Sequence, residues 1–69
     1  MEIIKLREEY IKLGQALKAA GLVDSGVDAK FVITEGRVKV NGVTEIQRGK
    51  KCYAGDVITF EGNEIRIEK

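Results

Sequence analysis

The stretch Glu-Gly-Arg-Val-Lys-Val-Asn-Gly, residues 35–42, decides the fold. Within it, basic residues alternate with valines, which is the period-two pattern of a strand with one buried face. Val38 and Val40 are therefore expected to face the core, while Arg37 and Lys39 share the opposite face. The glycine at the start of the stretch marks the end of a preceding helix.

The last two residues of this stretch, Asn41-Gly42, predict a tight hairpin turn, because both residue types tolerate the positive φ angles of a type I′ turn. Residues 43–46 are then the expected return strand. Further along, the sequence predicts a basic loop over residues 47–52 and a turn at Gly55-Asp56. A final hairpin is expected, with strands at residues 57–60 and 65–67 joined by a turn over residues 61–64.

Upstream, residues 8–20 predict a first helix, because apolar residues recur there at steps of three and four. Gly21 is the expected C-terminal cap. The expected buried face carries Tyr10, Leu13, Leu17 and Ala20, and the solvent face carries Lys12, Gln15 and Lys18.

A second helix is expected from Ser25 to Gly36, since serine is a good N-cap and an apolar stripe follows it at Ala29, Val32 and Ile33. Residues 2–6 predict a short strand that could pair with the last one. The elements predict an α+β fold, in which two packed helices lie against a small, bent antiparallel or mixed sheet.

The composition limits the classes of function. The chain has 69 residues, which is one domain at most, over residues 1–69. It has no histidine, so a Ser-His or Cys-His nucleophile pair and an imidazole zinc site are excluded. Its single cysteine, Cys52, is expected to be a small buried side chain rather than a reactive thiol. We therefore expect no enzyme, no cofactor and no metal.

The location of the charge carries more information than the net value of +1. Residues 37–51 hold five basic residues and one acidic residue, whereas the remainder holds seven basic and ten acidic residues. Such a polarised chain can present a basic face to an anionic partner. A single cysteine and the absence of a long apolar run favour the cytoplasm and argue against a membrane.

From Lys12 to Phe60 the chain resembles the S4 RNA-binding domain. The matching positions are Leu13, Leu17, Gly21, Ser25, Ala29, Ile33, Gly36, Val38, Val40, Asn41, Gly42, Gly55 and Asp56. Lys12, Gly14 and Gly26 depart from the broad family pattern, which has arginine, aspartate and arginine there. The chain is most similar to small stand-alone bacterial S4-like proteins, with Arg48-Gly49-Lys50-Lys51 as a further shared feature.

The resemblance implies the S4-like fold with its αL motif, and binding of structured RNA, ribosomal or transfer RNA, by shape and phosphate contacts. A ribosome-associated cytoplasmic monomer is the corresponding expectation. The candidate RNA-binding residues are Lys12, Lys30, Arg37, Lys39, Arg48, Lys50 and Lys51, with Gln15, Ser25 and Tyr53 as further candidates. Ser25 is expected mainly to cap its helix. Two alternatives stay open: an adaptor that docks its basic face on an acidic protein, and a DNA-binding module.

Overall fold

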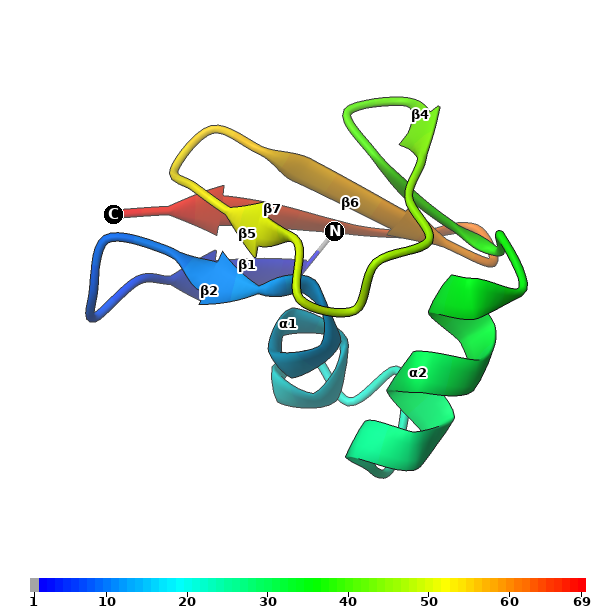
Figure 1. The fold of residues 1–69 in the computed structure, drawn as a ribbon. Helices are drawn as coiled ribbons and strands as arrows, with labels where there is room; N and C mark the ends of the chain where they lie inside the picture. Colours follow the sequence, from blue (N-terminus) through cyan, green and yellow to red (C-terminus); the bar gives the residue numbers. More distant parts are fainter. Residues whose placement is uncertain (1) are drawn as a thin grey trace.

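The structure, a computed structural model, describes residues 2–69. Two helices lie together on one side of a sheet, and a second, very short sheet lies beside them (Figure 1). The elements are β1 (Glu2–Lys5), β2 (Ile11–Lys12), α1 (Leu13–Ala19), α2 (Gly26–Thr34), β3 (Val38–Val40), β4 (Val43–Thr44), β5 (Lys51–Cys52), β6 (Val57–Phe60) and β7 (Asn63–Glu68).

The main sheet has five strands in the order β1-β7-β6-β3-β4. The first and last strands of the chain pair with each other, as the sequence indicated. β1 pairs with β7 in parallel, from Glu2↔Ile65 to Lys5↔Glu68. The other pairs are antiparallel. The α+β class, with two packed helices against a mixed sheet, is therefore confirmed.

Two hairpins in this sheet have turns of two residues. At Asn41-Gly42 the φ angles are 52° and 81°, which confirms the expected turn between β3 and β4. At Glu61-Gly62 the angles are 48° and 81°, and β7 begins directly afterwards at Asn63. The prediction of a longer turn over residues 61–64 was wrong, because glutamate carries no sequence signal for the left-handed conformation that it adopts here.

The first helix was predicted to begin too early. It begins at Leu13, because Lys12 has an extended backbone (φ −74°, ψ 146°) and belongs to β2 instead. β2 pairs with β5 in an antiparallel ladder of two residue pairs, Ile11↔Cys52 and Lys12↔Lys51. The expected loop over residues 47–52 is therefore also corrected, since its last two residues form β5.

The second helix follows the expectation more closely. It spans Gly26–Thr34, and the Ser25 hydroxyl oxygen accepts a hydrogen bond from the backbone N–H of Asp28 at 3.1 Å. Neither helix, nor any other among the described residues, is long and apolar enough to cross a membrane.

The core lies between the helices and the inner face of the five-stranded sheet. Buried side chains come from both helices, three strands of the main sheet and the short ladder, and burial of such apolar surface is the main stabilising contribution. They are Leu13, Ala16, Leu17, Ala29, Val32, Ile33, Val38, Val40, Cys52, Ile58, Phe60, Ile65 and Ile67, with Ile4 of β1 packed against them. The inward direction of Val38 and Val40 is confirmed. Tyr10 lies outside α1 and outside this core.

Candidate functional site

The short β2–β5 ladder brings two lysines together. Ile11 and Cys52 point inward, so Lys12 and Lys51, which form the next pair, both point outward from directly opposite positions. Like charges in such a pair destabilise it. Neither lysine forms an ion pair with a carboxylate of residues 2–69. The ladder therefore carries a concentrated positive charge that no carboxylate among residues 2–69 neutralises.

Two tyrosines continue this ladder. The segments Tyr-Ile-Lys (10–12) and Lys-Cys-Tyr (51–53) mirror each other, so antiparallel pairing places the tyrosines at the same end. Their ring centroids lie 5.9 Å apart, and the Lys51 ammonium lies 4.9 Å from the centre of the Tyr10 ring. Sequence analysis proposed Tyr53 but missed Tyr10; the mirrored triplets are the signal that could have identified it.

The basic segment that precedes β5, residues 47–50, is hydrogen-bonded to the start of α1. The carbonyl oxygens of Arg48 and Lys50 accept hydrogen bonds from the backbone N–H groups of Gly14 (3.1 Å) and Leu13 (2.8 Å). The first N–H groups of this helix are thereby satisfied within the protein. In Figure 1 the segment runs from β4 past α1 to β5. Its position beside the helix is fixed by backbone contacts that any sequence could make.

The side chain of Arg48 also needs a glycine beneath it. A Cβ atom on Gly14 would lie 2.7 Å from Cγ and 3.3 Å from Cδ of Arg48, and 3.6 Å from the Cβ of Ala29. The aliphatic part of the arginine thus lies directly over the helix backbone. The glycine at this position, a departure from the S4 pattern, is what lets the arginine lie there.

A groove of about 350 Å³ opens between the start of α1, the start of α2 and the basic segment. Three of its lining side chains are cations, and within residues 2–69 none of them is ion-paired. The lining residues are Lys12, Gly14, Gln15, Lys18, Gly26, Arg48 and Gly49. Sequence analysis placed Lys18 on a solvent face without proposing it for the site. Lys30 is exposed on α2, one helical turn after Gly26.

A network of hydrogen bonds holds the segment beyond β5. The Asp56 carboxylate accepts from the backbone N–H of Tyr53 (2.7 Å) and from the side-chain amide of Asn41 (3.0 Å). The side-chain oxygen of Asn41 in turn accepts from the backbone N–H of Val57 (2.9 Å). Asn41 therefore both forms the β3–β4 turn and ties that turn to the segment that carries Lys51 and Tyr53.

The two predicted cations of the first hairpin lie elsewhere. Arg37 pairs with Glu61 (2.5 Å) and Glu35 (3.5 Å), and its guanidinium lies 5.6 Å from the centre of the Phe60 ring. Lys39 stands opposite Thr44 and Thr59 on the sheet face turned away from the helices. Neither of these two side chains lines the groove.

The buried thiol of Cys52 is protonated at neutral pH. Desolvation raises the pKa of Cys52 from 9.0 to about 11; the Asp56 carboxylate adds to the rise and Lys50 opposes it. The expectation of a small buried side chain is confirmed. Among the described residues, no three histidine, cysteine, aspartate or glutamate side chains are grouped as a metal site.

Comparisons with known proteins give consistent relatives. The S4 domain family model matches residues 4–68. The probable ribosome maturation protein RlbA of Bacillus subtilis is 44% identical over 59 residues, covering 86% of this chain and 83% of that protein. The putative RNA-binding protein YbcJ of Escherichia coli is 34% identical over 61 residues, covering 88% of this chain and 87% of that protein.

A larger protein and a solved structure are also similar. The tyrosine–tRNA ligase of Burkholderia lata is 40% identical over 52 residues, which are 75% of this chain but 13% of the ligase. The solution structure of YbcJ, described as revealing an αL motif involved in RNA binding, has a TM-score of 0.77 and 33% identity, covering all of this chain and 89% of that one.

Proposed function

Because the chain belongs to the S4 domain family, we propose that it is an RNA-binding module that grips a structured RNA by its phosphates. The observation that carries this proposal is the Lys12–Lys51 pair. It places two like charges opposite each other, with no acidic partner among residues 2–69. Such an arrangement costs stability in the free protein and is relieved when an anion binds.

The groove places Lys12 beside two further cationic side chains. Arg48 and Lys18 line it together with Lys12, and Gln15 adds a neutral hydrogen-bonding group. Arginine can bind a phosphate through two parallel hydrogen bonds, whereas lysine acts as a mobile point charge. Lys50, Lys51 and Lys30 extend the positive surface on either side, and Tyr10 and Tyr53 offer rings on which an unpaired base can stack. Arg37 and Lys39 are left out of this interface.

The names of two relatives support a proposal for the class of RNA. One is named as a ribosome maturation protein and another acts on a transfer RNA, so we propose a ribosomal or transfer RNA, bound by a cytoplasmic monomer that is a single domain over residues 1–69. We propose that the module acts by binding, which the names of its relatives, a ribosome maturation protein and a putative RNA-binding protein, support. An acidic protein or a DNA duplex as the true ligand is an outcome of the test below.

Crosslinking in cells, followed by sequencing of the attached RNA, tests the proposal. The triple variant Lys12→Ala/Arg48→Ala/Lys51→Ala should lose most of the crosslinked RNA. The matched control Lys5→Ala/Lys39→Ala/Arg66→Ala removes the same charge from the outer sheet face and should crosslink normally. In vitro, the slope of log K against log[salt] should become shallower by about 3 in the groove variant only. Equal loss in both triple variants, or preferential binding of acidic peptide or B-form DNA, would overturn the proposal.

A further inference from the structure

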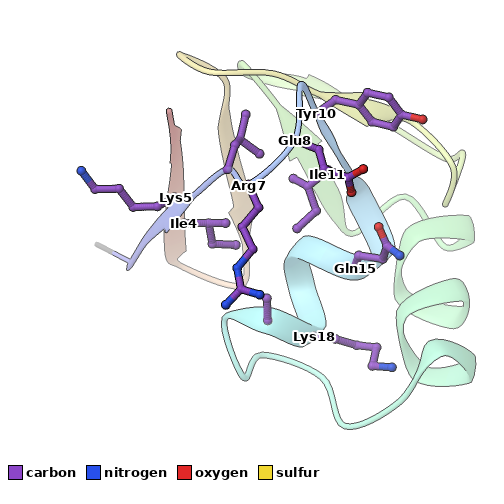
Figure 2. Close-up of a pocket in the computed structure, with 10 residues that line it drawn as sticks. Ile4, Lys5, Arg7, Glu8, Tyr10, Ile11, Gln15 and Lys18 are labelled. Carbon is purple, nitrogen blue, oxygen red and sulfur yellow. The ribbon is translucent and has the colours of Figure 1, made fainter.

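A second hollow lies beside the groove, on the other side of α1's first turn. It measures about 420 Å³, which is within the range of small-ligand sites. It lies between the end of β1, the segment that leads to β2, and the outer side of α1 (Figure 2). Gln15 and Lys18 line both the hollow and the groove, so the two form one continuous surface.

The floor of the hollow is apolar. Ile4, Leu6 and Ile11 are partly buried and pack against the core, and Ala19 lines the hollow from the helix. These side chains leave apolar surface exposed to water at a place that neither helix covers. A flat, weakly polar group can displace that water with a gain in free energy.

The rim of the hollow is charged and polar. Figure 2 shows Arg7 extending across it toward α1, while Lys18 points from α1 toward α2; Lys5 points away and pairs with Glu68. Neither Arg7 nor Lys18 is ion-paired within residues 2–69. The side chains of Glu8 and Gln15 face one another at the edge nearest the groove, where they offer an acceptor and a donor.

From this combination we propose that the hollow takes one unpaired nucleotide of the RNA that lies in the groove. Its base rests on Ile4, Leu6 and Ile11, and its phosphate binds the Arg7 guanidinium, while Lys18, which points toward α2, contacts the part of the RNA in the groove. The proposal rests on the proposed function, because the continuity of the two surfaces is what identifies the occupant. Unpaired bases are the parts of a folded RNA that a protein can read along their edges, and Glu8 with Gln15 supplies that contact.

Two RNA probes test the idea: a fully paired hairpin, and the same hairpin with a single bulged 4-thiouridine. The bulged hairpin should bind about tenfold more tightly, as expected for one well-held base. Irradiation should attach the bulged nucleotide to the peptide that contains residues 4–11, as mapped by mass spectrometry.

The variant Ala19→Leu fills the hollow from an exposed helical position. It should reduce binding of the bulged hairpin to the level of the paired one and leave the paired one unchanged. Ala19→Ser, which adds little volume, should keep the preference. Arg7→Ala should also weaken the preference, whereas Arg66→Ala, on the outer sheet face, should not.

The results separate this inference from the function on which it rests. If both hairpins bind equally and the groove triple variant loses both, the RNA-binding function stands and the nucleotide site is refuted. If Ala19→Leu keeps the preference, or the bulged base attaches only outside residues 4–11, the site is likewise refuted. If neither hairpin binds with a salt-dependent affinity, the proposed function and the inference fail together.

Discussion

The variant Lys12→Glu should make the protein more stable and a poorer RNA binder. Lys12 stands directly opposite Lys51 in the β2–β5 ladder and at the N-cap of α1, where a cation also opposes the helix dipole. Removing one like-charge pair and creating one opposite-charge pair each contribute about 0.5 kcal/mol, for a total of about 1 kcal/mol in the free energy of unfolding. In a domain of this size that amounts to about 5 °C in Tm.

Thermal and urea denaturation at low salt measure the gain. In 1 M NaCl the gain should nearly vanish, because the screening length there is about 3 Å. RNA affinity should fall at the same time, with a slope of log K against log[salt] that is shallower by about 1. Lys39→Glu is the matched control, since it makes the same charge change at a position of β3 whose two cross-strand neighbours are threonines. Its stability and its RNA affinity should both change less than those of Lys12→Glu.

The reasoning fails if Lys12→Glu is less stable than the parent protein at low salt, or if the variant binds RNA with unchanged affinity and slope. The first result would mean that the two lysines do not repel each other in the free protein. The second would mean that the ladder lies outside the RNA interface.

Three further variants test other parts of the structure. Gly14→Ala should keep the fold but weaken RNA binding several-fold, because its Cβ would lie 2.7 Å from Arg48 Cγ. In an Arg48→Ala background the same substitution should have no further effect on affinity, and an equal loss with and without the arginine would refute the role of the glycine. Asp56→Ala should lower the free energy of unfolding by about 2 kcal/mol, since two hydrogen bonds to a carboxylate are lost; urea denaturation beside the exposed-site control Asp24→Ala measures this. The Cys52 thiol, with its pKa raised to about 11 against 9.0, should make stability decline as the pH rises from 9 to 11, because the unfolded chain loses its proton first; Cys52→Ala should show a smaller decline over that interval.

Most of the main sheet and the second helix could be predicted from the sequence. The alternation around Val38 and Val40 and the Asn41-Gly42 turn are local signals, and they were sufficient for the β3–β4 hairpin. Ser25 likewise indicated the start of α2, because a capping hydroxyl acts within three residues.

The β2–β5 ladder could not be predicted in the same way. A strand of two residues has no period, and the steps of three and four from Tyr10 to Leu17 are also those of a helix, so β2 was assigned to α1. The site suffered from the same limitation. The ion pair of Arg37 with Glu61 depends on a turn far along the chain, and the groove depends on two helix ends and a loop meeting in space.

The ladder that carries the paired lysines is also a small pairing unit of the backbone. It has only two residue pairs, whereas β7 is flanked on both sides by strands. Local opening of so small a unit takes less free energy than global unfolding, so the amides of β2 and β5 should exchange with deuterium well before those of β6 and β7. An RNA that contacts both lysines would stabilise the closed ladder. Slower hydrogen exchange of the β2 and β5 amides in the presence of RNA would therefore be a direct measure of binding at this site.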